Sequence, residues 1–146
     1  MPKHQRVLGI DYGTRRTGIA IGDTETRLAL PFEMFEALPD PQLAQAIAQL
    51  ARKEAIDAII IGLPLNADGS ISSQSKITER FILKLIQTVG PTIPIHRASE
   101  YLSTHGAEGK LAGHFTRDQK RQRVDALAAA AILQDWLDAQ PRDSAN

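Results

Sequence analysis

The sequence predicts an α/β fold in which a mixed sheet is covered by helices. Two short apolar runs near the N-terminus are joined by a glycine-containing turn, which is typical of a β-hairpin. A later run, "DAIIIGLP", is continuously apolar, which is typical of a central strand buried on both faces. Between and after these runs, apolar residues recur at helical spacing, so strands and helices are expected to alternate.

Five strands are expected. The first two span residues 6–11 and 17–22 and form a hairpin through "YGTRR". A third runs through 27–37, where Pro31 favours an edge position or an irregular strand. The buried central strand spans 57–64, and "TIPIHR" supplies a short strand at 92–97.

Four helices are expected, each from a start signal or an apolar stripe. Asp40 is expected to cap the first, with Pro41 at its first helical position. Ser72 or Ser73 begins the second, which Gly90-Pro91 ends; a weaker helix follows from Ser103, and the last runs from about Arg123 to Asp138. Phe81 and Trp136 fall on apolar helix faces and are expected in the core.

The order β-β-β-α-β-α-β-α-α is the order of an RNase H-like fold, with helices on both faces of a five-stranded mixed sheet. We expect one such domain over residues 1–138, followed by a polar tail at 139–146. The 17 basic and 17 acidic side chains cancel, so any nucleic-acid affinity must come from a local basic patch.

The chain has no cysteine, which excludes disulfides, thiolate zinc sites and cysteine nucleophiles. No signal peptide and no apolar run of the roughly 20 residues needed for a membrane span is visible. We therefore expect a cytoplasmic protein without a membrane partner.

Three acidic residues stand where carboxylates are unusual. Asp11 ends an apolar strand, Glu100 follows the strand at 92–97, and Asp125 lies in the first turn of the last helix, facing partly inward. Strand ends meet at one edge of an open sheet, and a covering helix can bring a carboxylate to the same place. A pair of such charges about 4 Å apart costs on the order of 4 kcal/mol, which a divalent cation such as Mg²⁺ or Mn²⁺ would offset.

Each residue also has a structural interpretation. Asp125 is a favourable charge for a helix N-terminus, Asp11 is an acceptable turn residue, and Glu100 is a plausible solvated loop residue. Only the set of three predicts a metal-dependent phosphodiester cleavage site.

Three stretches, "GIDYGTRRTGIAIGD", "IIIGLPLNADGS" and "VDALAAAAIL", resemble the YqgF family of RNase H-like proteins. Its members are described as candidate pre-16S rRNA nucleases and Holliday-junction-resolvase-like proteins. The resemblance covers about residues 6–138 and implies metal-dependent nuclease chemistry with Asp11, Glu100 and Asp125 as the catalytic and metal-binding carboxylates.

The family's third motif usually reads Asp-Glu-Arg-Leu-Ser/Thr-Thr, and here the matching stretch is "SEYLST". Ser99 replaces the acidic residue and Tyr101 replaces the arginine. If Glu100 is the ligand the triad is complete, whereas an essential acid at position 99 would leave the protein weakened or inactive.

Basic and amide side chains near the triad are candidates for holding a phosphate backbone. Arg15 and Arg16 lie on the hairpin turn beside Asp11, and Asn66 follows the buried strand. A basic segment with Lys120, Arg121 and Arg123 leads into Asp125. Solvated surface is the alternative for each of them.

Three functions remain open at this point. The first is a nuclease on structured RNA, favoured over DNA, acting in 5′-end maturation of pre-16S rRNA, with ribosomal precursor particles as partners and a monomer or homodimer as the assembly. A Holliday-junction-resolvase-like DNA nuclease is its variant. The second is a nucleic-acid-binding module that has lost catalysis. The third is a kinase-like ATPase, since the first hairpin also resembles a phosphate-binding hairpin.

Overall fold

The computed structural model describes residues 4–101 and 117–141, with side chains described for 4–100 and 125–141. Five strands form one sheet in the order β3-β2-β1-β4-β5. Strands β1, β2 and β3 are antiparallel neighbours, whereas β4 and β5 run parallel to β1. The strands are β1 Arg6–Asp11, β2 Arg16–Asp23, β3 Leu28–Glu36, β4 Ala58–Leu65 and β5 Ile95–Tyr101, and the helices α1 Asp40–Lys53, α2 Ser73–Val89 and α4 Arg117–Ala139.

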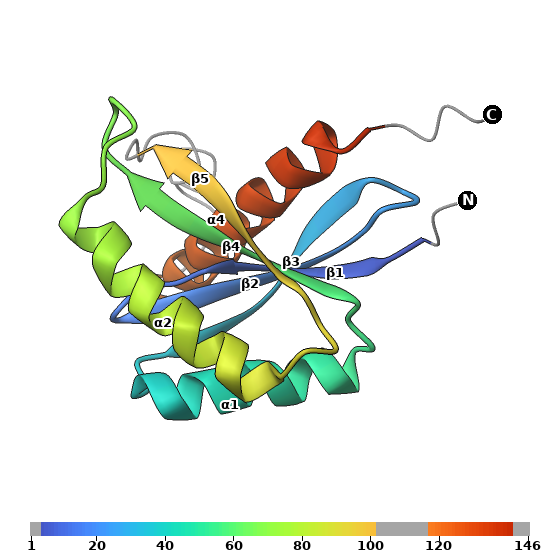
Figure 1. The fold of residues 1–146 in the computed structure, drawn as a ribbon, viewed down its shortest axis with the longest axis horizontal. Coiled ribbons are helices and arrows are strands. Elements are labelled where there is room, and N and C mark those ends of the chain that lie inside the picture. The colour runs from blue at the N-terminus through green and yellow to red at the C-terminus, as the bar shows by residue number, and fades with distance from the viewer. Residues whose placement is uncertain (1–3, 102–116, 142–146) are drawn as a thin grey trace.

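The helices cover both faces of the sheet, as predicted (Figure 1). Helices α1 and α2 pack on one face, and α4 crosses the other. Alternate residues of β4 therefore enter two separate cores: Ile59 and Ile61 face α1 and α2, while Ala58 and Ile60 face α4. The five-stranded mixed sheet and the burial of the central strand on both faces are confirmed.

The expected core aromatics differ in burial. Phe81 is fully buried in the α1–α2 core and stacks on Tyr12 with ring centroids 4.4 Å apart. Trp136 packs against the α4 core but is only partly buried, and its ring lies over that of His96.

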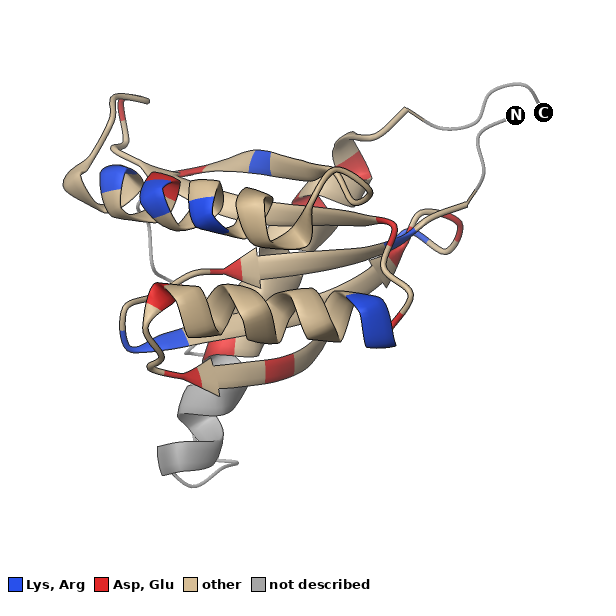
Figure 2. Ribbon diagram, turned by 60° about the horizontal axis from the view of Figure 1, so that its bottom comes forward, with Lys and Arg blue, Asp and Glu red and all other residues tan. Residues whose placement is uncertain are grey.

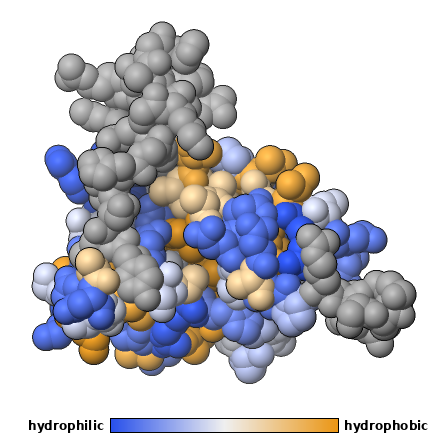
Figure 3. Space-filling model, turned by 90° about the horizontal axis from the view of Figure 1, so that it is seen from above, coloured by the Kyte–Doolittle hydropathy of each residue, from blue (hydrophilic) through white to orange (hydrophobic). Residues whose placement is uncertain are grey.

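The edge strand β3 is irregular where the sequence predicts it. Its pairing with β2 shifts between Ile19 and Ala20, opposite Glu33 and Pro31, so one residue is left over as a bulge. Apolar patches also remain among the hydrophilic surface (Figure 3), and the large exposed apolar residues include Leu28 and Leu30 of β3.

The prediction that Asp40 caps α1 is wrong. The N-cap is Pro39, no side chain caps the helix, and Asp40 is already helical. Its carboxylate instead accepts a hydrogen bond of 2.8 Å from the Tyr12 hydroxyl, which ties α1 to the end of β1. Ser72 does cap α2, in a reciprocal capping box with Ser75.

The boundaries of β5 and of the last helix were also placed wrongly. Strand β5 begins at Ile95, after Pro94, and its parallel pairing follows β4 as far as Leu65. Glu100 therefore lies within a strand rather than after one. Helix α4 begins at Arg117, six residues before the expected start at Arg123. The expected helix from Ser103 and most of the polar tail lie outside the described residues. No helix in the described part of the chain is long and apolar enough to cross a membrane.

A candidate metal centre on the α4 face of the sheet

The three predicted carboxylates come from three elements and meet on the same face of the sheet. Asp11 ends β1, Glu100 lies near the end of the parallel strand β5, and Asp125 lies in α4. The alternation of β1 directs Val7, Gly9 and Asp11 toward α4, because Val7 belongs to the α4 core and Gly9 lies against Leu133.

Glu100 is directed to this face by the same alternation. Ala98, two residues earlier, packs against the α4 core. A Cβ built on Gly62 of the neighbouring strand would lie 3.7 Å from a carboxylate oxygen of Glu100 and 2.7 Å from Ile132 of α4. The Glu100 carboxylate therefore lies at the boundary between the sheet and α4.

Gly18 brings Asp125 to the site. Residue 18 pairs with Asp11 across the β1–β2 ladder, and the Asp125 backbone carbonyl lies directly over it. A Cβ on Gly18 would be only 1.9 Å from that carbonyl oxygen. The first glycine of "TGIAIG" thus allows α4 to approach closely enough to place a second carboxylate beside Asp11.

Gly18→Ala is therefore expected to push the start of α4 off the sheet. The overpacking should cost about 1–3 kcal/mol of stability and lower metal-dependent cleavage, because Asp125 moves with the helix. Gly90→Ala is the control: Gly90 has φ +87° and ψ −175° with no neighbour within 4 Å of an added Cβ, so it should cost about 1–3 kcal/mol through backbone strain without changing cleavage. Urea unfolding and cleavage rates of both variants test this; equal activities would contradict the positioning role of Gly18.

Two carboxylates of the site, those of Asp11 and Glu100, have a raised pKa. Burial, and then the negative charges of Glu100 and Asp125, raise the pKa of Asp11 from its ordinary 3.8 to about 7. Burial and the charge of Asp135 raise the pKa of Glu100. Asp135, on an exposed part of α4, is an acidic neighbour that sequence reasoning missed. The site is short of positive charge, as a cation-binding site of oxygen ligands would be.

One basic side chain already contacts the triad. The Nε of Arg16 donates a hydrogen bond of 2.8 Å to Oδ2 of Asp125, and both side chains are mostly buried. Its neighbour Arg15 is exposed. Of the two arginines predicted to bind nucleic acid, Arg15 is open to a ligand, whereas Arg16 is engaged by the triad itself.

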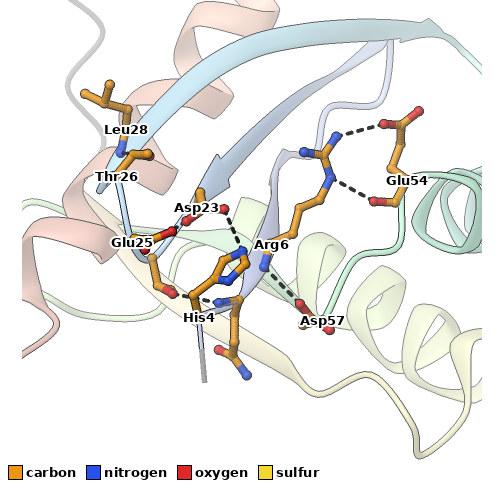
Figure 4. Close-up of polar contacts among 10 residues, drawn as sticks. His4, Arg6, Asp23, Glu25, Thr26, Leu28, Glu54 and Asp57 are labelled. Carbon is orange, nitrogen blue, oxygen red and sulfur yellow. Dashed lines mark hydrogen bonds and ion pairs between the residues drawn. The ribbon is translucent and has the colours of Figure 1, made fainter. Parts of the chain in front are cut away.

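The carboxylates fit a divalent metal in chemistry, although their ligand atoms do not all lie within 4.8 Å of one another. Ligands of one Mg²⁺ at about 2.1 Å lie at most about 4.2 Å apart. Among the described residues, the acidic group whose ligand atoms all lie within 4.8 Å of one another is His4, Asp23 and Glu25 rather than the triad. These residues lie near Arg6, at the opposite end of β1 from Asp11, and Figure 4 shows the 3.2 Å contact between the His4 ring and Asp23.

The remaining predicted binding residues are placed as follows. The Asn66 side-chain amide donates to Ser70 Oγ and to the Ile71 carbonyl, so it closes its own loop at the end of β4. Lys120, Arg121 and Arg123 lie in α4, but their side chains lie outside the described ones. Ser103 and Thr104 of the third motif also lie outside the described residues.

Ser99 lies on the opposite face of β5 from Glu100. Its side chain is exposed, and Arg97, which shares its face, forms an ion pair with Glu79 of α2. The substitution of the family's acidic residue by Ser99 is therefore a change on the α2 side of the sheet, away from the triad.

A basic row on α2 was also missed. Lys76, Arg80 and Lys84 follow one another at intervals of four residues, so they share one side of the helix, and Figure 2 shows the basic positions of α2 in blue. The spacing is visible in the sequence and could have been found there.

The chain matches a known protein family and several named relatives over nearly its whole length. A family model described as "RuvX: Holliday junction resolvase" matches residues 5–139. A protein of Azotobacter vinelandii named "Putative pre-16S rRNA nuclease" is 39% identical over 92% of this chain and 94% of its own length. A protein of the same name from Rhodopirellula baltica is 37% identical over 94% of this chain and 79% of its own length.

Solved structures share the fold. The Thermus thermophilus RuvC protein, solved with a Holliday junction substrate, superposes with a TM-score of 0.55 at 15% identity, over 92% of this chain and 94% of that one. The fowlpox virus Holliday junction resolvase gives a TM-score of 0.51 at 14% identity, over 92% and 99%. At these identities the likeness concerns the fold, which is that of RuvC-like, RNase H-fold resolvases.

Proposed function

Because the chain belongs to the RuvX family, we propose that it is a divalent-metal-dependent nuclease that matures the 5′ end of pre-16S rRNA. Nuclease activity follows from the family and from relatives at 34–39% identity. The observation that carries the metal dependence is the coupled carboxylate set of Asp11, Glu100 and Asp125, in which burial and two negative neighbours raise the pKa of Asp11 to about 7.

Each residue has a proposed task. Asp11, Glu100 and Asp125 would hold Mg²⁺ or Mn²⁺, which supplies the positive charge that stabilises the attacking and leaving oxygens of phosphodiester cleavage. Asp11 would release its proton when the cation binds, because the cation reverses the local charge. Exposed Arg15 would contact a phosphate oxygen beside Asp11. We assign further contacts with the nucleic-acid backbone to Lys120, Arg121 and Arg123. Asn66 would join them by giving up one of its two hydrogen bonds within the loop.

RNA is the proposed substrate because the relatives that match nearly the whole chain carry the rRNA nuclease name. Ribosomal precursor particles in the cytoplasm would then be the partners. Cleavage of a four-way DNA junction is the second candidate, favoured by the family description and by the fold shared with the RuvC–junction complex.

The test compares two substrates under matched conditions. End-labelled precursor 16S RNA and a four-way DNA junction are incubated with wild type and with Asp125→Asn, in Mg²⁺, in Mn²⁺ and in EDTA. We expect metal-dependent cleavage of the RNA by wild type alone. Preferential cleavage of the junction would show that the substrate is DNA rather than RNA. Equal RNA cleavage by wild type and Asp125→Asn would refute the assignment of the site.

The basic row on α2 should contribute to RNA affinity through phosphate contacts. Replacing Lys76, Arg80 and Lys84 together by Gln should weaken binding at low salt and reduce the slope of log K against log [salt] by about two. Filter binding from low to high salt measures both. Arg52→Gln with Lys53→Gln, at the exposed end of α1, is the matched control and should change the slope little.

A further inference from the structure

Arg16 provides a positive charge inside an otherwise acidic site. Its Nε lies 2.8 Å from Oδ2 of Asp125, and the side chains are only 29% and 21% exposed, so water screens this pair less than it screens a surface pair. The residues are 109 positions apart, and their contact joins the start of β2 to α4. Among the described ion pairs, this is the one that includes a triad carboxylate.

The bond to Arg16 occupies one of the two carboxylate oxygens of Asp125 through which a cation could bind. A guanidinium and a divalent cation repel each other, so sharing Oδ2 of Asp125 at close range is unfavourable. Breaking this bond would make Oδ2 available to another cation, so the guanidinium and a divalent cation would compete for Asp125.

We propose that Arg16 is the counter-cation of the metal-free site and that it competes with the divalent cation for Asp125. Without metal, the guanidinium neutralises Asp125 and relieves its repulsion with Asp11. When the cation binds, Arg16 leaves Oδ2 and the carboxylate turns toward the ion. This proposal rests on the proposed function, because it requires Asp125 to be a metal ligand.

The opposite role is that Arg16 orients Asp125 for the metal, as a hydrogen-bond partner behind a ligand does. The two roles predict opposite changes when Arg16 is removed. If Arg16 competes with the metal, removing it should increase the metal affinity. If Arg16 orients Asp125, removing it should lower the metal affinity by about 10–100-fold. Metal affinity, measured without nucleic acid, therefore separates them.

The experiment titrates metal-free protein with Mn²⁺ by calorimetry, and follows thermal unfolding in EDTA and in saturating Mn²⁺. Arg16→Gln should bind Mn²⁺ about tenfold more tightly than wild type, because a charged hydrogen bond no longer has to break. In EDTA the same variant should melt at a lower temperature than wild type. Saturating Mn²⁺ should raise the melting temperature of the variant by more than it raises that of wild type. Arg52→Gln, an exposed arginine at the end of α1, should match wild type in both measurements.

Two further proteins make each outcome decisive. Arg16→Lys keeps a competing positive charge and should bind Mn²⁺ with nearly wild-type affinity. If Arg16→Gln does not fold, the Mn²⁺ affinity of Arg16→Lys still tests the proposal. Asp125→Asn tests the site itself. If Asp125→Asn loses Mn²⁺ binding but Arg16→Gln binds no more tightly than wild type, the counter-cation role is refuted and the proposed function stands. If Asp125→Asn binds Mn²⁺ as wild type does, both are refuted.

Discussion

Replacing Asp11 by Asn is expected to abolish metal-dependent cleavage and, at the same time, to stabilise the metal-free protein at neutral and alkaline pH. The loss of cleavage should be at least about 100-fold, since removal of even an indirect partner of a metal ligand costs 10–100-fold. The gain in stability has a separate origin: the wild-type fold holds a buried carboxylate close to two others, which the amide relieves.

The pH dependence of this gain follows from the raised pKa. A carboxyl group whose pKa rises from 3.8 to about 7 on folding favours the folded state only while it is protonated. Wild type should therefore lose stability as the pH rises from about 4 through about 7, and Asp11→Asn should lack this loss. At 1.36 kcal/mol per pH unit, the shift of about three units sets an upper limit of about 4 kcal/mol at pH 8.

Urea unfolding in EDTA at pH 4, 6 and 8 measures the difference between the two proteins, which should grow with pH. Adding Mg²⁺ at pH 8 should stabilise wild type and leave Asp11→Asn unchanged, so the gap should narrow. Glu33→Gln, on the exposed edge strand, is a control for the removal of an acidic charge far from a desolvated site. If the difference in unfolding free energy between wild type and Asp11→Asn were the same at all three pH values, the pKa of Asp11 would not be raised in the folded protein.

The sequence was sufficient to predict the sheet and to select the three carboxylates that the structure brings to one face of it. Asp11 could be selected because a carboxylate is unusual at the end of an apolar strand, and Asp125 because its helical neighbours are alanine and isoleucine. Whether they meet depends on the depth at which α4 packs, which Gly18 determines through a contact between residues far apart in the chain. The glycine pattern was visible, but its role at the helix interface required the structure.

Contacts across the fold account for most of what sequence reasoning missed. From the sequence alone, Arg16 is expected to be an exposed hairpin residue. In the structure α4 brings Asp125 within hydrogen-bond distance of its guanidinium. From the sequence alone, Asp135 is expected to be a solvated helix residue. Its effect on the pKa of Glu100 depends on the angle at which α4 crosses β5. Neither partner can be inferred from local periodicity, because periodicity specifies which face a side chain lies on and not which distant element faces it.

The third motif shows how an error of a few residues in a strand boundary can obscure a functional conclusion. With the strand ending at residue 97, positions 99 and 100 belonged to a loop and had no defined direction. The structure continues β5 to Tyr101, so the two side chains alternate, with Glu100 toward α4 and Ser99 exposed on the other side. This geometry favours Glu100 as the ligand and disfavours a binding module without catalysis.

Glu100→Gln is accordingly expected to lower metal-dependent cleavage at least about 100-fold, whereas Ser99→Asp should change it by less than about threefold. The glutamine keeps the size of the side chain and removes a charge that contributes to the raised pKa of Asp11, so the pKa of Asp11 should fall in this variant. The aspartate at position 99 adds a charge at an exposed position and should alter stability by no more than about 0.5 kcal/mol.

Cleavage rates and Mn²⁺ titrations of both variants measure these effects, with the carboxyl resonance of Asp11 followed by NMR in the metal-free proteins. A large gain of activity in Ser99→Asp, together with wild-type activity in Glu100→Gln, would show that the acidic ligand belongs at position 99. In that case this chain would have lost a ligand, and binding without cleavage would become the better account of its function. Loss in Glu100→Gln alone would instead show that the substitution at position 99 leaves the triad complete.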